Sequence, residues 1–319
     1  MPNDLLSVLI PTYNRADFLD FSLEIHIPLL KKHNIQIIIF DNASTDNTRE
    51  IAYKWSQKYP YLTYHRHEEN IGGVGNFEYA LQYPSTEYVW ILGDTYHIQD
   101  GTIDYIIKTI NSSPQKIDAI VLNLQEKINI PTCHYNNSNI LLNELGALMT
   151  CIAVSIFRKD MIREDILIRY RSLWFTHAAI IFESISNRDF LIHWAQGHSI
   201  VSLEHPTLQK TNWSHTPKAF EIGCEDWTNF VMSLPPSYKL ENKMKCIMNF
   251  GKVSGLFTLK NLILLRIQGL LNIQIFNKYK KLFPLTINYP LGLLLIMSLI
   301  PTSILSFFVK IYQILKGRK

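Results

Sequence analysis

The fold of this chain is decided by the stretch Tyr88-Val-Trp-Ile-Leu-Gly-Asp-Thr-Tyr-His-Ile-Gln-Asp-Gly101. The apolar run from Tyr88 to Leu92 predicts a buried strand, and Gly93 interrupts it directly before Asp94. Ligands bind at the carboxyl ends of strands in open α/β sheets. The stretch therefore predicts a strand that places Asp94 at the edge of a binding site, although an Asp that only caps the next turn has the same local sequence.

Strand and helix patterns alternate around this stretch. The expected strands cover residues 5–10, 35–40, 61–65, 88–92 and 117–124, and the expected helices cover 17–32, 47–58, a segment ending near 82, and 101–111. This alternation predicts βαβ units and an α/β fold with a Rossmann-like, mostly parallel sheet covered by helices on both faces. Right-handed crossovers place the carboxyl end of every strand along one rim, so the polar loops after residues 10, 40 and 92 share a crevice.

Composition limits the class of protein. The 319 residues are 47% hydrophobic with a formal net charge of +4, which is enough to build a full core and too little charge for a dense nucleic-acid-binding face. The four cysteines contain no C-x-x-C, so neither a zinc ribbon nor a disulfide framework is indicated. The first residues lack the pattern of a secretory signal, so we expect the catalytic part in the cytoplasm.

Four motifs occur in order along the first 125 residues: Ser7 to Asn14, Asp41 to Thr48, Asn70 to Asn76 and Trp90 to Asp94. In sequence and spacing they resemble those of family-two glycosyltransferases of the GT-A fold, of the bacterial surface-polysaccharide type. The resemblance implies a GT-A domain over residues 1–215, with a nucleotide-sugar half at 1–125 and an acceptor half at 126–215. Residues 216–319 then form a helical C-terminal region.

The resemblance implies a donor site on the first three motifs. Asp41 would accept a hydrogen bond from the base or the ribose. The end of the first strand would line the same slot with Pro11, Thr12, Tyr13 and Arg15. An alternative is that Asp41 only closes an Asx turn with Ser44 or Thr45. The glycine loop with Asn70, Gly73 and Asn76 would present amide groups to the phosphates, although its spacing matches neither a Rossmann nor a Walker pattern. Gly93 and Asp94 complete the expected site.

The acidic motif departs from the family, because Thr95 stands where most members carry a second aspartate. Mg²⁺ and Mn²⁺ prefer carboxylate and phosphate oxygens, so a neutral hydroxyl is a poor replacement. Asp94 could hold the metal with the donor phosphates, His97 or His205 could complete a softer site, or a basic side chain could replace the metal. We favour the first of these explanations, and a chain that has lost catalysis is a further alternative.

The acceptor half should supply a general base. His177 precedes the apolar helix expected at residues 178–185, at the place where many relatives carry a Glu-Asp pair. Imidazole titrates near neutral pH, so we predict His177 as the base and Glu183, on the same helix, as the second candidate. The competing interpretation of His177 is a helix cap or a packing residue.

The C-terminal region is predicted to associate with a membrane over residues 282–319. The stretch 291–309 approaches the roughly 20 apolar residues of a spanning helix, but Pro301 lies near its centre and basic residues follow it. A shallow interfacial helical hairpin is favoured, and an ordinary buried helix pair is the alternative.

Taken together with the resemblance, these features predict an inverting glycosyltransferase. It would move a sugar from a nucleotide sugar, with a UDP-sugar favoured, to a hydroxyl of a glycan linked to a polyprenyl diphosphate. The expected location is the cytoplasmic face of the inner membrane, as a peripheral or shallowly inserted protein. A catalytically silent nucleotide-sugar-binding subunit is the alternative, and a nucleotidyltransferase is disfavoured because no glycine-rich basic loop follows the first strand.

Overall fold

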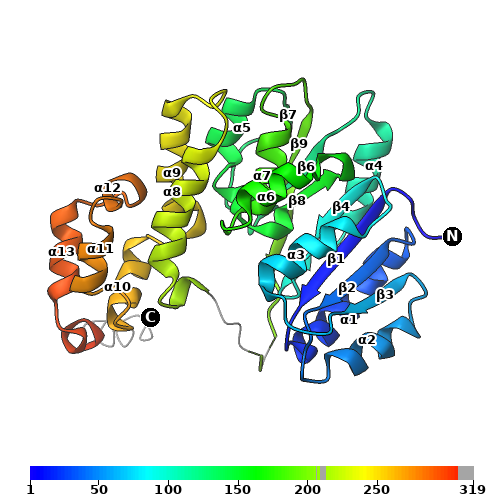
Figure 1. The fold of residues 1–319 in the computed structure, drawn as a ribbon, viewed down its shortest axis with the longest axis horizontal. Helices are drawn as coiled ribbons and strands as arrows, with labels where there is room; N and C mark the ends of the chain where they lie inside the picture. Colours follow the sequence, from blue (N-terminus) through cyan, green and yellow to red (C-terminus); the bar gives the residue numbers. More distant parts are fainter. Residues whose placement is uncertain (206, 209–212, 308–319) are drawn as a thin grey trace, which may run out of the picture. The chain divides into compact units, whose positions relative to one another are not determined.

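The computed structural model describes residues 1–205, 207–208 and 213–307 (Figure 1). The chain divides into two compact units. The first consists of Met1–Leu141 and Leu148–Lys210, and the second of Leu142–Ala147 and Thr211–Lys319. The short segment 142–147 therefore belongs with the C-terminal helices, which the sequence boundary at 215 did not anticipate.

The first unit is built on a nine-stranded sheet whose N-terminal half is parallel. In the order β3-β2-β1-β4, this half contains β1 (Leu6–Thr12), β2 (Gln36–Asp41), β3 (Leu62–Arg66) and β4 (Tyr88–Ile91). The cores of β1, β2 and β4 are buried on both faces, which explains why they read as continuous apolar runs. The four strands predicted for this part of the chain are therefore present.

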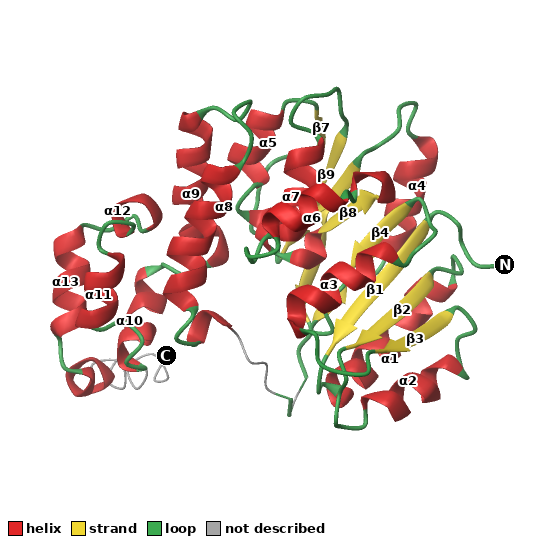
Figure 2. Cartoon of the chain, in the orientation of Figure 1, coloured by secondary structure: helices red, strands yellow, loops and turns green. Residues whose placement is uncertain are grey.

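Helices cover both faces of these strands. They are α1 (Ala16–Lys31), α2 (Thr48–Ser56), α3 (Gly72–Gln82) and α4 (Thr102–Ser112). Figure 2 shows α3 lying in front of the parallel strands, with α1 and α2 on the other side. On α4 the apolar stripe of Ile103, Ile106 and Ile107 is buried, as its helical spacing requires.

The other half of the sheet is mixed, so the prediction of a mostly parallel sheet is corrected there. Strand β8 (Ser155–Arg158) runs antiparallel between β4 and β6 (Ala119–Leu124), and β9 (Ile192–Ser202) is parallel to β6. The short strands β5 (Tyr96–Ile98) and β7 (Cys133–Tyr135) pair antiparallel with β9. The chain also forms α5 (Ser138–Leu145), α6 (Glu164–Tyr170) and α7 (Thr176–Ser184).

A buried histidine fixes the strand that follows the acidic motif. The backbone N–H of Ile98 on β5 donates to His26 Nε2 at 3.0 Å, and Ser22 Oγ lies 3.1 Å from His26 Nδ1. Since Nε2 accepts this bond, the imidazole must be neutral, and burial lowers the pKa of His26 to about 3. Helix α1 therefore holds β5 in place through an uncharged side chain.

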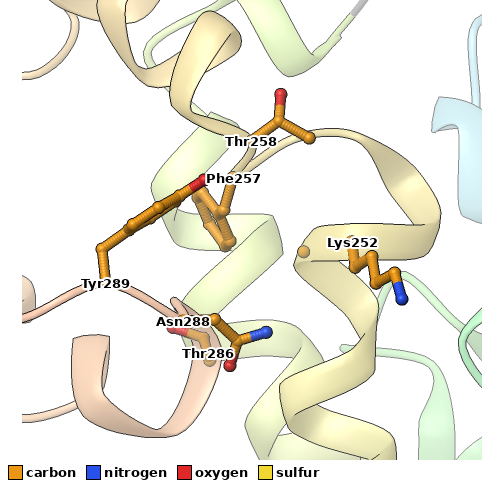
Figure 3. Close-up of a pocket in the computed structure, with 7 residues that line it drawn as sticks. Lys252, Phe257, Thr258, Thr286, Asn288 and Tyr289 are labelled. Carbon is orange, nitrogen blue, oxygen red and sulfur yellow. The ribbon is translucent and has the colours of Figure 1, made fainter.

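The second unit is helical. It contains α8 (Trp227–Ser233), α9 (Leu240–Ser254), α10 (Leu259–Ile267), α11 (Ile273–Tyr279), α12 (Phe283–Thr286) and α13 (Leu291–Leu299). Its core is aromatic, with the rings of Trp227, Phe230 and Phe250 stacked on one another. A cavity of about 230 Å³ opens between α9, α10 and the 286–289 segment, and Figure 3 shows Lys252, Asn288 and Tyr289 around it.

The predicted membrane segment lies in this unit. Among the described residues, no helix has both the length and the apolar character that crossing a membrane requires. Helix α13 covers nine residues of the stretch 291–309. Residues 308 and 309, at the end of this stretch, lie outside the described part of the chain. Helix α13 ends two residues before Pro301, because proline cannot continue a helix.

We predict that acid weakens the first unit between pH 6.5 and pH 5. His26 is neutral in the folded chain down to about pH 3, whereas in the unfolded chain it takes up a proton below about pH 6.5. The unfolded state therefore binds more protons in this range, and the free energy of unfolding falls by about 1.4 kcal/mol per pH unit for each such histidine. Urea titrations at pH 7, 6 and 5 measure this slope.

The control is His26→Gln, whose side chain can accept the Ile98 N–H but does not titrate. Its slope should be shallower than that of the wild type by the contribution of one proton. An unchanged slope would mean that His26 is not the group responsible.

Candidate functional site

The ends of β1, β2 and β4 bring two of the predicted side chains into direct contact. Thr12 pairs with Asp41 in the register of β1 and β2, and β4 lies on the other side of β1. At the end of β1, Thr12 Oγ1 donates a hydrogen bond to Oδ2 of Asp94, which follows β4, at 3.1 Å. Thr12, Asp41 and Asp94 are all buried, with at most 5% of each exposed. The predicted convergence of these three residues on one rim is therefore present in the structure.

Arg15 neutralises Asp94. Its Nη1 lies 3.1 Å from Asp94 Oδ1, so each carboxylate oxygen of Asp94 accepts from a side chain of the loop after β1. One third of the Arg15 side chain remains exposed, which leaves the guanidinium accessible from the crevice. Gly93 allows the sharp turn beside it, because a Cβ at this position would approach the Tyr96 ring to 3.2 Å.

Asp41 forms the inner wall of the site. Its Oδ1 accepts from the backbone N–H of Ser44 at 2.9 Å, which is the Asx turn that the sequence offered as the alternative. Its Oδ2 accepts from Tyr64 OH at 2.6 Å and lies 3.6 Å from Arg66 Nε. Burial and the bond to Asp41 raise the pKa of Tyr64, so the phenol stays a donor. Asp41 thus shapes its own loop, and its contact with a ligand remains a prediction.

The loops after β1 and β2 are tied together. The backbone N–H of Asn14 donates to Ser44 Oγ at 2.9 Å, and the side chain of Asn14 accepts from Thr45 N at 2.7 Å. Asn14 has φ of +51°, a backbone conformation that asparagine tolerates well. Beside this junction Tyr13 is 44% exposed, so its ring is free to meet a flat base, while Pro11 is half-buried.

The glycine loop has a mainly structural pattern of bonds. Asn70 Oδ1 accepts from Asn42 Nδ2 and from Gly72 N, both at 2.9 Å. Asn76 is buried, donates to the carbonyl of Phe40 and lies 3.0 Å from His67 Nε2. The Asn76 amide therefore fastens α3 to β2, and its contact with a ligand remains a prediction. A side chain added at Gly73 would meet nothing within 4 Å, so this position faces open space in the first turn of α3.

The described residues do not fit a resident metal ion. Within them, no group of three or more His, Cys, Asp or Glu side chains is arranged to hold one. Asp94 is the only carboxylate of the acidic motif proper, and both of its oxygens already accept hydrogen bonds. His205, part of the second explanation, lies against Phe21 at 4.8 Å between rings. A cation at this site would therefore rest on Asp94 and the donor phosphates, so the divalent cation remains a prediction.

The two predicted base residues lie in the acceptor half and are engaged there. His177, in the first turn of α7, is buried, and its Nε2 lies 3.0 Å from the carbonyl oxygen of Thr150. Burial lowers its pKa to about 4. Glu183 accepts from Tyr170 OH at 2.6 Å and pairs with Arg169 at 2.9 Å. This environment favours the packing interpretation of His177 over the role of general base.

Tyr64 and Arg66 are the site residues that the sequence analysis missed. They alternate along β3, and the register that pairs Arg66 with Asp41 turns both toward that carboxylate. The only signal in the sequence is their period-two spacing at the end of a weak strand. This signal does not identify the neighbouring strand, so it could not have indicated Asp41 as the partner.

Part of the chain is similar in sequence to known proteins. Residues 7–141 match the family model of glycosyl transferase family 2. A relative is the abequosyltransferase RfbV of Salmonella typhimurium, which is 39% identical over 92 residues. The match covers 28% of this chain and 27% of RfbV, so the chain spans about a quarter of that relative's length.

Solved structures share the fold over most of the chain. TarS of S. aureus, residues 1–349 in complex with UDP-GlcNAc, superposes with a TM-score of 0.58 at 16% identity, covering 88% of this chain and 81% of TarS. The mannosyltransferase PcManGT of Pyrobaculum calidifontis, in complex with GDP-Man and Mn²⁺, gives 0.53 at 14% identity, covering 94% and 89%. The mixed α/β fold with its central sheet is thus that of GT-A glycosyltransferases. The predicted recognition is confirmed by the match of residues 7–141 to the model of glycosyl transferase family 2 and by the fold shared with these structures.

Proposed function

We propose that this chain is a glycosyltransferase that takes a sugar from a nucleotide-sugar donor. The observation that carries the proposal is the convergence of Thr12, Asp41 and Asp94 at the ends of three adjacent strands. RfbV is named a transferase of a sugar, and the TarS structure contains a UDP-sugar. A UDP-sugar is therefore the favoured donor, and we expect Tyr13 and Asp41 to meet its base and ribose.

The proposed reaction inverts the anomeric centre. The bond between sugar C1 and the β-phosphate oxygen breaks, and its electron pair leaves with the nucleoside diphosphate. The acceptor hydroxyl oxygen forms the new bond at C1 from the opposite face and gives up its proton to a base. His177 is the residue predicted for this task, and its Nε2 lies 3.0 Å from the carbonyl oxygen of Thr150.

The proposed acceptor is a glycan on a polyprenyl diphosphate at the cytoplasmic face of the inner membrane, in the synthesis of a bacterial surface polysaccharide. The second unit supports a membrane partner because its apolar side chains reach solvent. Leu291, Ile296 and Leu299 on α13 are exposed, as is Phe307 beyond it. Lysines 278, 280 and 281 in the same unit would suit anionic head groups.

A catalytically silent donor-binding subunit is the second candidate function. It is favoured by Thr95, which stands in place of an acid. Such a protein would bind a nucleotide sugar without turnover.

The test of donor use begins with a panel of nucleotide sugars in a thermal-shift assay, because a ligand of the native state raises stability with its affinity. The donor that binds is then assayed for transfer or hydrolysis. We expect Asp94→Ala to lower turnover by at least about a hundredfold, since it removes the partner of Thr12 and Arg15 at the reacting end of the site.

Asp104→Asn is the matched control. This carboxylate on α4 is partly exposed and bound by Lys32 and His33, so its loss should leave turnover unchanged. Tight donor binding without turnover in the wild type would favour the silent subunit, and the absence of any donor binding would exclude both candidate functions.

The pH dependence of transfer separates the two interpretations of His177. With a pKa of about 4, a His177 base would be unprotonated throughout the range from pH 5 to pH 8. We therefore expect kcat/KM of the wild type and of His177→Gln to depend on pH in the same way near pH 6.5. We also expect the variant to keep transfer within a few-fold of wild type. A loss of about a hundredfold or more in a folded His177→Gln protein would instead identify His177 as the base.

Membrane contact is tested by flotation with vesicles. We expect the full chain to bind vesicles that contain anionic lipid and to bind less as salt rises, because salt screens the lysines. Ile296→Glu with Leu299→Glu should reduce binding several-fold, since each places a charge on the exposed apolar side of α13. Ile168→Glu, at an equally exposed position on α6, is the control and should bind as the wild type does.

A further inference from the structure

An unusual turn follows β6 in the first unit. Gln125 and Glu126 have φ of +51° and +56°, so two consecutive residues other than glycine adopt the left-handed conformation. Such a conformation persists only where the surrounding structure enforces it, and it concentrates at functional sites. The turn is therefore a candidate for a role that the sequence motifs do not include.

Buried hydrogen bonds hold the turn rigidly. The buried Asn123 side chain accepts from the backbone N–H groups of Leu124 and Ile128 and donates to the carbonyl of Ile128 at 2.9 Å. From β9, Ile200 O accepts from Gln125 N at 3.0 Å, and Ser199 Oγ accepts from Glu126 N at 3.1 Å. The next residue, Lys127, consequently leaves the turn in one fixed direction.

The turn lies on the same rim as the donor site. Strand β8 runs antiparallel to both β4 and β6, so β4 and β6 point the same way and end at the same edge of the sheet. Figure 1 shows the three strands side by side. Lys127 thus follows a strand end of the kind that carries Thr12, Asp41 and Asp94.

A short relay of side chains connects Lys127 with the acidic motif. Cys151 is buried, and it lies close enough to the Lys127 amine and to the Tyr96 hydroxyl to influence the pKa of both groups. Tyr96 stands two residues after Asp94, and its backbone N–H donates to the carbonyl of Gly93 at 3.0 Å. Cys151 is therefore a neighbour both of the lysine and of the segment that follows Asp94.

The arginines near the crevice are already paired with carboxylates, so a bound diphosphate would need a further positive charge. The guanidinium of Arg15 is paired with Asp94, and that of Arg66 lies beside Asp41. A donor adds a diphosphate, and Thr95 contributes no carboxylate through which a divalent cation could compensate it. The Lys127 side chain is exposed enough to reach a ligand, while partial burial lowers the pKa of its amine.

We propose that Lys127 binds the diphosphate of the nucleotide-sugar donor and stabilises the negative charge that develops on it as the sugar departs. This inference rests on the proposed function. In it, the Lys127 side chain on the turn after β6 compensates the diphosphate charge that a metal ion would otherwise compensate. The ammonium group donates charge-assisted hydrogen bonds to phosphate oxygens, and no bond to Lys127 forms or breaks.

The experiment compares nucleoside diphosphates with nucleosides in the presence of EDTA. UDP, CDP and GDP, and uridine, cytidine and guanosine, are titrated calorimetrically into the full chain, and the tightest diphosphate and its nucleoside are followed in variants. We expect Lys127→Met to weaken the diphosphate by about tenfold or more, because a charge-assisted bond is lost, and to leave the nucleoside unchanged. Lys127→Arg should stay within a few-fold of wild type.

Lys108→Met is the matched control, because Lys108 is an exposed lysine on α4. Its diphosphate affinity should equal that of the wild type, and thermal unfolding of all variants checks that they are folded. The inference is overturned if Lys127→Met weakens diphosphate and nucleoside equally or neither, or if EDTA alone abolishes diphosphate binding to the wild type. A wild-type chain that binds no diphosphate would overturn the proposed function as well.

Discussion

The contact of Asp94 with Thr12 and Arg15 is the constraint on which the site depends. A carboxylate that is almost fully buried must be paired and hydrogen-bonded, and these two side chains satisfy both of its oxygens. The contact joins the loop after β1 to the turn after β4, so two segments distant in the sequence are held together before any ligand arrives. Preorganisation of this kind reduces the ordering cost of binding.

The same constraint extends beyond the carboxylate. After Gly93 and Asp94 the chain turns into β5, where the Ile98 N–H meets His26 on α1. Helix α1 begins directly after Arg15, so one element supports the acidic motif from both of its ends. The neutrality of His26 is required by this arrangement, because a protonated Nε2 could not accept the backbone bond.

Asp41 has a structural role that is compatible with the ligand contact predicted for it. The Asx turn with Ser44 was offered as the alternative to ligand binding, and the structure contains it. A carboxylate has about four lone-pair sites, and Asp41 accepts two close hydrogen bonds, from Ser44 N and Tyr64 OH, so it keeps capacity for a ligand donor. The turn and the bond from Tyr64 also fix the direction in which that capacity is presented.

The sequence predicted most of the N-terminal half because the signals there are local. Apolar runs such as 37–40 and 88–92 identify buried strands whatever their partners are, and the polar residue that ends each run identifies the rim. The apolar run at 117–124 likewise predicted β6, whereas β5, β7 and β9 could not be found in this way. Strands β5 and β7 have three residues each, and β9 mixes histidine, glutamine and Gly197 among its apolar residues and shifts register along β6. The partners of Asp41 depend on strand register, and the burial of His177 depends on tertiary packing, so neither is encoded in a local pattern.

The distribution of charge explains why the donor site needs a cation from its own unit. Residues 242–319 carry 12 Lys and Arg and no Asp or Glu, so the positive charge of the chain is concentrated in the helical region. The first unit is rich in acids, and its two arginines nearest the crevice already face Asp94 and Asp41. These arginines compensate the charge of the two carboxylates. They would therefore add little attraction for a diphosphate that enters the crevice. A lysine held on the rim by a rigid turn supplies that attraction without a second aspartate, and it accounts for a motif in which Thr95 replaces the acid.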